Sequence, residues 1–152
     1  FICYICTINL IAMIPDRQFK KLEHQYRNYT VVMNGGELEK GYKPDCVLQK
    51  GHDYVILESE CSTNRKMFIG CMIKAAHFLH GNNTGILVIV LSEHYNTKVD
   101  QIANHLKPYY EWIKDKTNLR KVYIIKDGAY RKNDTLVEIE SEKFMAEAIS
   151  VL

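Results

Sequence analysis

The stretch from Ile86 to Leu91 constrains the fold of this chain more than any other part of the sequence. It reads ILVIVL and contains no polar residue. A strand with one face in solvent alternates apolar and polar residues, whereas a strand covered on both faces is apolar throughout. We therefore expect residues 86–91 to form a central strand of a sheet that helices cover on both sides, which is typical of α/β proteins.

Helical patterns lie before and after this strand. Apolar residues recur every three or four positions, and the expected ends carry capping residues or glycine. Pro108 is expected to kink or split the third helix. The predicted helices span residues 15–28, residues 64–80 with Gly81 as the stop, residues 97–113, and a short closing segment from Ser141.

Runs rich in β-branched and aromatic residues between the helices predict the other strands. They cover residues 30–34, 43–49, 54–60, 120–126 and, as an edge strand, 135–139. The predicted order is helix, three-stranded meander, helix, strand, helix, strand, in a mixed sheet flanked by helices. A chain of 152 residues without repeats or a linker is expected to be a single domain over residues 1–152.

Composition limits the environment of the chain. The five cysteines are odd in number and several lie in apolar runs, which favours a reducing, intracellular (cytoplasmic) compartment over disulfides. Residues 1–14 are almost wholly apolar but too short to span a bilayer. They are expected to be either a misplaced start of the reading frame or an added strand. The net charge of +2 indicates no particular class of partner.

Two strands joined by a tight turn bring acidic residues together. Residues 50–53, Lys-Gly-His-Asp, are typical of a hairpin turn with Gly51 at positive φ. In the register that this turn sets, Asp45 faces Glu58, and Glu60 shares their face because side chains alternate. Facing like charges destabilise a sheet, so the pair favours a cation, and oxygen ligands suit Mg²⁺ or Mn²⁺. The alternative is that both acids are surface charges near a turn.

The spacing of these acids resembles a known nuclease pattern. Pro44-Asp45, twelve residues, and then Glu58-Ser59-Glu60, with helices before and after, resembles the PD-(D/E)xK nuclease superfamily. The resemblance implies a restriction-endonuclease-like core, Mg²⁺ held by Asp45, Glu58 and the carbonyl of Ser59, and hydrolysis of phosphodiester bonds. It also implies an acid on the first helix, for which Glu23 is the candidate, unless that glutamate is simply solvated.

Glu60 stands where the superfamily usually has lysine, a variant that resembles some type II restriction endonucleases. Either Glu60 acts as a base or helps to hold a second metal, or the following helix supplies a lysine. Lys66 is the candidate for that lysine. It shares a helical stripe with Gly70, Lys74 and His77, which is expected to face either the carboxylates or solvent.

The remaining candidates are side chains that could contact phosphate groups, although single basic residues in loops are usually just solvated. They are Asn64, Arg65, Lys74, Arg131 and Lys132. We expect a metal-dependent endonuclease that binds the phosphate backbone of DNA, forms a homodimer to cut both strands, and has no stable membrane partner.

Two other classes of function stay open. A non-catalytic nucleic-acid-binding or scaffold protein is favoured if Lys43, which is expected to face Glu60, and Lys66 neutralise the carboxylates. A membrane-associated protein would be tethered through residues 1–14.

Overall fold

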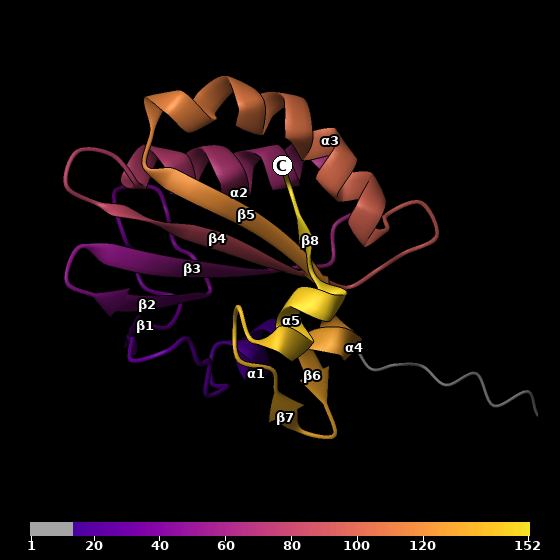
Figure 1. The fold of residues 1–152 in the computed structure, drawn as a ribbon. Helices are drawn as coiled ribbons and strands as arrows, with labels where there is room; N and C mark the ends of the chain where they lie inside the picture. Colours follow the sequence, from indigo (N-terminus) through magenta and orange to yellow (C-terminus); the bar gives the residue numbers. More distant parts are fainter. Residues whose placement is uncertain (1–13) are drawn as a thin grey trace, which may run out of the picture.

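The computed structural model describes residues 14–152, so the expectations for residues 1–13 lie outside the described part of the chain. Its centre is a six-stranded mixed sheet in the order β1-β2-β3-β4-β5-β8, and β6 pairs separately with β7. Figure 1 shows helices on both faces of the sheet, which confirms the α/β class. The strands are β1 (Thr30–Met33), β2 (Cys46–Lys50), β3 (Asp53–Glu60), β4 (Thr84–Leu91), β5 (Leu119–Lys126), β6 (Arg131–Lys132), β7 (Thr135–Leu136) and β8 (Ile149–Ser150). The helices are α1 (Asp16–Phe19), α2 (Arg65–Phe78), α3 (Val99–Ile113), the 3-10 turn η1 (Lys114–Lys116), α4 (Asp127–Tyr130) and α5 (Glu142–Glu147).

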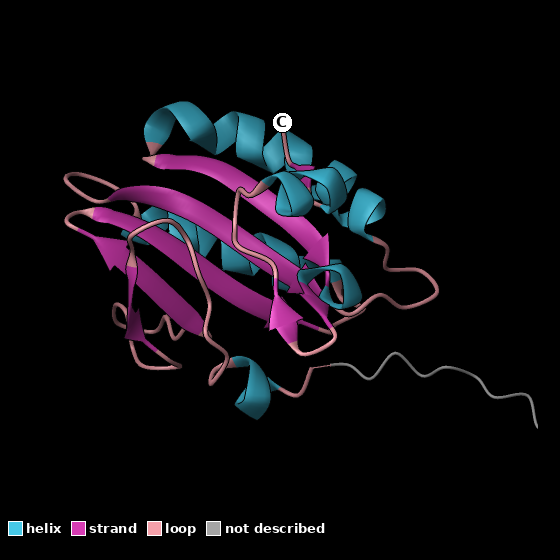
Figure 2. Ribbon diagram, turned by 60° about the horizontal axis from the view of Figure 1, so that its bottom comes forward, coloured by secondary structure: helices cyan, strands magenta, loops and turns pink. Residues whose placement is uncertain are grey.

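Strand β4 is the central strand that the apolar run predicts. It runs parallel to β3 on one side and to β5 on the other. Parallel neighbours need crossover connections, and α2 and α3 supply them. In Figures 1 and 2 these two helices lie on one face of the sheet, while α1, α4 and α5 lie on the other.

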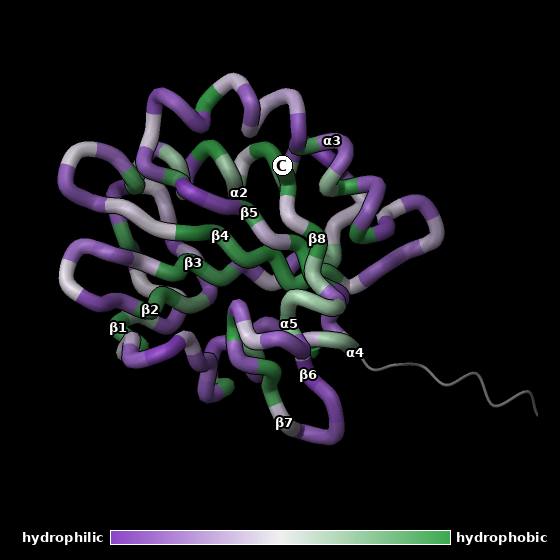
Figure 3. The backbone as a smooth tube through the Cα atoms, viewed as in Figure 1, coloured by the Kyte–Doolittle hydropathy of each residue, from purple (hydrophilic) through white to green (hydrophobic). Residues whose placement is uncertain are grey.

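Each face of the sheet has its own apolar core. Ile56 of β3 packs in the cluster with α2 and α3, whereas Val55 and Leu57 pack in the cluster on the opposite face. Figure 3 shows the apolar character of the central strands and the hydrophilic character of most loops. Because side chains alternate along a strand, Glu58 shares the face of Ile56 and points toward α2.

The hairpin forms in the predicted register. Its pairs run from Lys50 opposite Asp53 to Cys46 opposite Leu57. Gly51 takes a φ of +61°, the left-handed conformation that the turn requires. Asp45 lies directly before β2, and the next pair in this register is Asp45 opposite Glu58.

Helix α2 begins and ends where its capping residues predict. The side chain of Asn64 accepts a hydrogen bond from the amide of Lys66, at 3.1 Å. The helix closes at Leu79, and Gly81 follows with a φ of +59°. The cap fixes the first turn of α2 shortly after Glu60, and this brings basic residues of the helix near the end of β3.

The prediction of a helix over residues 15–28 is wrong, because α1 ends at Phe19. The carbonyl of Phe19 accepts a hydrogen bond from Nε2 of His24 at 2.8 Å, and Nδ1 of His24 lies 2.7 Å from the hydroxyl of Tyr130. His24 is buried, and so is Tyr26 on the same face. The apolar spacing of this segment therefore reflects packing of a loop against the sheet.

Smaller differences appear in the second half of the chain. Helix α3 is not split at Pro108, because both Pro108 and Asn104, whose carbonyl loses its partner, are exposed to water. The expected edge strand 135–139 shortens to β7, which pairs with β6, and the edge of the main sheet is β8, which was not predicted.

Two observations bear on the environment of the chain. No helix within residues 14–152 has the length and apolar character needed to cross a membrane. Cys46, Cys61 and Cys71 are free thiols.

Candidate active site

A pocket of about 430 Å³ opens at the end of β3, on the side of the sheet that α2 covers. Three segments form its walls: the end of β3, one side of α2 from Lys66 to Lys74, and the loop before β2. Acidic and basic side chains share this space, together with a tyrosine and a cysteine. The lining residues are Gly41, Tyr42, Lys43, Glu58, Glu60, Lys66, Met67, Gly70, Cys71 and Lys74.

Asp45 is fixed next to these acids by two contacts. Its Oδ2 accepts a hydrogen bond from the backbone amide of Ser59 at 2.8 Å, and its Oδ1 lies 3.3 Å from Nζ of Lys20. Ser59 separates the two glutamates in β3, so the carboxylate of Asp45 is held at the backbone between them, although Asp45 itself does not line the pocket. The backbone carbonyl of Ser59 points to the same side of the strand as its amide. Both groups therefore face the position of Asp45.

Glu58 is the most buried acid of the group, with 7% of its surface exposed. Burial, followed by the nearby carboxylates of Asp45 and Glu60, raises its pKa to about 8, although the hydroxyl of Tyr42 and the backbone of Asp45 partly oppose the shift. Within residues 14–152 no lysine or arginine forms an ion pair with Glu58 or Glu60. Glu58 is therefore a buried carboxyl group that lacks a compensating cation.

Glu60 lies beside Cys71 of α2. The thiol Sγ donates to Oε1 of Glu60 at 3.3 Å. Burial raises the pKa of Glu60, and the contact with Cys71 partly offsets this. Burial also raises the pKa of the Cys71 thiol, so Cys71 is a neutral hydrogen-bond donor rather than a nucleophile.

Lysine side chains line the same pocket as the carboxylates. Lys66 and Lys74 line it with Gly70, as the helical stripe predicts, whereas His77 contacts Glu39 instead. The expected ion pair between Lys43 and Glu60 does not form in the described part of the chain, and Lys66 has no ion pair there either. Lys43 and Lys66 are therefore available to an anion that enters the pocket, whereas Lys74 also donates to the carbonyl of Gly41.

Comparisons with protein-family models, curated proteins and solved structures found no match for this chain. The chemistry of the site therefore rests on its own residues.

Several candidates from the sequence do not reach this pocket. Glu23 is exposed and lines a separate pocket with Lys21 and Asp134, because the helix that was expected to carry it does not extend beyond Phe19. Arg131 and Lys132 line a third pocket and pair with Asp134 and Glu147. Asn64 serves as the cap of α2, and Arg65 is exposed in its first turn.

The structure also adds three residues that the sequence did not suggest. Lys20 pairs with Asp45 across a gap of twenty-five positions, for which no local pattern exists. Tyr42 lies in a loop without periodicity. Cys71 could have been found, because on a helical wheel it lies next to Lys74 and Met67 in the arc that lines the pocket.

The donor set fits a hard divalent cation. Among residues 14–152 no three side chains of His, Cys, Asp or Glu are already grouped to hold a metal ion. Asp45, directly before β2, and Glu58 of the adjacent strand β3 offer two carboxylates, and the Ser59 carbonyl lies on the side of β3 that faces Asp45. Mg²⁺ is commonly bound by one or two carboxylates, with water and substrate phosphate completing its shell. The uncompensated burial of Glu58 is the observation that favours a cation here.

The raised pKa of Glu58 predicts how stability depends on pH without a divalent ion. The stabilising contribution of the protonated form is complete below the ordinary pKa of 4.5 and is lost as the pH rises through about 8. A Glu58→Gln variant lacks this loss, so it should gain stability relative to the parent between pH 5 and pH 8.5. Urea unfolding in EDTA measures the difference. A Glu23→Gln control should follow the parent, and parallel pH profiles for the parent and Glu58→Gln would contradict the assignment.

Proposed function

We propose that this chain is a Mg²⁺-dependent endonuclease that hydrolyses phosphodiester bonds in DNA, built on a restriction-endonuclease-like core. The observation that carries the proposal is Glu58, a buried acid without a cation, in a pocket that it shares with Glu60 and three lysines. Asp45 is held nearby, on the backbone amide of Ser59. A divalent ion would compensate the negative charge of the acids, and a phosphodiester group would pair with the positive charge of the lysines. A phosphodiester group bound together with Mg²⁺ uses both kinds of charge within one pocket.

In this proposal the acids and lysines have separate tasks. Asp45 and Glu58, with the carbonyl of Ser59, would hold the cation. When bound, Mg²⁺ supplies positive charge that activates water and stabilises the phosphate in the transition state. Lys66 binds the phosphate before reaction. Glu60 takes the proton of the attacking water, because its burial keeps its pKa above that of an ordinary carboxylate.

A second candidate function is a non-catalytic nucleic-acid-binding protein with the same fold. The ion pair between Lys20 and Asp45 favours it, because it already neutralises one of the two acids that would hold the metal. The pair is partly exposed, with 38% of the Lys20 side chain accessible, so an incoming divalent ion competes with it at modest cost.

Plasmid cleavage separates the two candidates. The parent chain should nick or linearise supercoiled DNA with Mg²⁺ and not with EDTA, and Asp45→Ala should be inactive. Glu23→Ala is the matched control, because it removes an exposed acid outside the pocket and should cleave like the parent. Equal cleavage by the parent and Asp45→Ala, or no cleavage by the parent, would overturn the nuclease assignment. If both DNA strands are cut, the chain should sediment as a homodimer.

The lysines make a prediction about binding that does not depend on cleavage. Lys66→Ala should weaken binding of a DNA duplex and lower the slope of log affinity against log salt by about one. Lys132→Ala should change neither, since Lys132 is engaged with Glu147 outside the pocket. Fluorescence anisotropy in Ca²⁺ or EDTA at several salt concentrations measures both variants. Equal slopes for the parent and Lys66→Ala would exclude Lys66 from the phosphate contact.

A further inference from the structure

The hydroxyl group of Tyr42 is a buried polar atom without a partner. Tyr42 is 3% exposed, and its Oη has no hydrogen-bond partner among the described residues. A buried hydroxyl of this kind is costly, and such groups in native proteins usually meet a partner that joins later, such as water or a ligand. Tyr42 also lines the pocket that holds Glu58 and Glu60.

The loop that carries Tyr42 is held firmly in place. The amide of Leu38 donates to the carbonyl of Tyr42 and the amide of Tyr42 donates to the carbonyl of Glu39, each at 2.9 Å. Gly41 between them takes a φ of +81°, which favours glycine. These contacts therefore fix the position of Tyr42 at the wall of the pocket.

Helix α2 anchors the same loop. Nζ of Lys74 donates to the carbonyl of Gly41 at 3.1 Å, and Nδ1 of His77 lies 2.8 Å from Glu39. The aromatic ring of Tyr42 packs in the core with Phe68 and Met72. The hydroxyl of Tyr42 is the part of this side chain that makes no hydrogen bond within residues 14–152.

The surroundings of this hydroxyl indicate which ligand would use it. The hydroxyl of Tyr42 approaches the carboxyl of Glu58 closely enough to lower the pKa of Glu58 as a hydrogen-bond donor, yet the contact lies outside the geometry of a formed hydrogen bond. Lys43, Lys66 and Lys74 line the same space. A ligand that accepts from a tyrosine hydroxyl and from ammonium groups is an anion with several oxygens, and a phosphate group has that form.

We propose that Tyr42 donates a hydrogen bond to a non-bridging phosphate oxygen of the bound DNA strand and so positions the strand against the acids. The inference rests on the proposed function, because it places the same substrate in the same pocket. Tyr42 is a positioning residue: it neither holds the cation nor accepts the proton of water.

Tyr42→Phe removes only the oxygen and tests this directly. Binding of a labelled DNA duplex, measured by anisotropy in Ca²⁺, should weaken by about tenfold, as expected for the loss of a hydrogen bond to a charged group. In urea unfolding without DNA or divalent ions, the variant should be at least as stable as the parent, because no hydrogen bond is lost. Tyr26→Phe is the matched control. Its hydroxyl donates to Glu140 at 2.8 Å, so this variant should lose stability and keep its DNA affinity.

The outcomes separate this inference from the proposed function. If Tyr42→Phe binds DNA as the parent does, or loses stability as Tyr26→Phe does, the hydroxyl has a structural role and the inference fails, whether or not the parent cleaves plasmid. If the parent binds DNA without cleaving it and Tyr42→Phe binds more weakly, the inference holds and the nuclease assignment fails. If the parent binds no DNA, both fail.

Discussion

Replacing Glu58 by glutamine is expected to slow Mg²⁺-dependent DNA cleavage by at least about 100-fold. Glutamine keeps the size of the side chain and removes the negative charge that the cation requires. The site provides few other ligands, since Asp45 is shared with Ser59 and Lys20. Single-turnover cleavage of a plasmid, with enzyme in excess over DNA, measures the chemical step apart from product release.

The control for this prediction is Glu23→Gln, which makes the same chemical change on an exposed side chain that lines another pocket. It should cleave at the rate of the parent. Because Glu58→Gln should be at least as stable as the parent near pH 8, unfolding cannot explain its loss of activity. A rate within a few-fold of the parent would show that Glu58 does not take part in the reaction.

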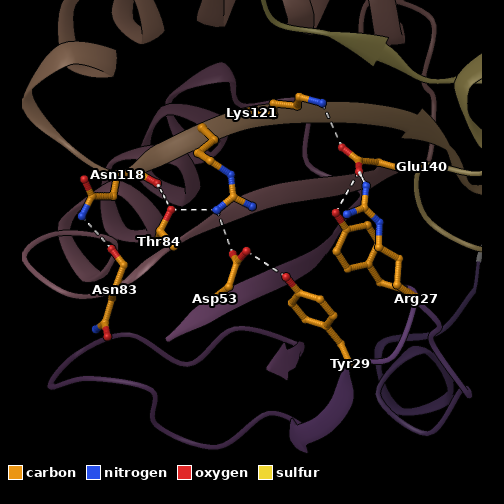
Figure 4. A network of polar contacts seen from close by, with 10 residues as sticks. Arg27, Tyr29, Asp53, Asn83, Thr84, Asn118, Lys121 and Glu140 are labelled. Carbon is orange, nitrogen blue, oxygen red and sulfur yellow. Dashed lines mark hydrogen bonds and ion pairs between the residues drawn. The ribbon is translucent and has the colours of Figure 1, made fainter. Parts of the chain in front are cut away.

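Replacing Glu140 by alanine is expected to cause the largest loss of stability. Its two carboxylate oxygens accept from Tyr26, Arg27, Lys121 and Tyr123, at 2.8 to 3.1 Å. Figure 4 shows Arg27 and Lys121 approaching Glu140 from different segments of the chain. These contacts lower the pKa of Glu140 despite its burial, so the charged form stabilises the folded state.

Removal of this carboxylate leaves two tyrosine hydroxyls and two cations without their acceptor. We expect the free energy of unfolding to fall by about 2 to 3 kcal/mol, less than for a fully buried pair because Arg27 and Lys121 are partly exposed. The melting temperature should drop by about 5 to 10 °C. Glu111→Ala is the control, since its pair with Lys114 is exposed and should contribute little to stability. Equal melting temperatures for the two variants would contradict this role of Glu140.

The hairpin and α2 could be predicted because their signals are local. Gly51 fixes the turn, and the period of two in a strand then decides which residues face each other. Asn64 and Gly81 mark the ends of α2 in the same way. The placement of Lys66 and Lys74 in the pocket with Glu58 and Glu60 is one of the two orientations that the sequence left open for this stripe.

The contacts that sequence did not predict are those between distant segments. The apolar spacing of Phe19, Leu22 and Tyr26 suits a helix, but it also suits a loop packed on a sheet, and the bonds of buried His24 to Phe19 and Tyr130 fix the second arrangement. The pairing of Lys20 with Asp45 depends on that arrangement. Similarly, β8 joins the sheet through only two pairs, with Tyr123 and Ile124, and such a short strand has no recognisable pattern.

Calorimetric titration with Mn²⁺ tests most directly whether the acids at the end of β3 form a cation site. The parent and Glu23→Gln should bind the ion, whereas Asp45→Ala and Glu58→Gln should bind it at least about tenfold more weakly. Equal affinity in all four proteins, or no binding by the parent at millimolar Mn²⁺, would contradict the cation site and with it the proposed hydrolysis.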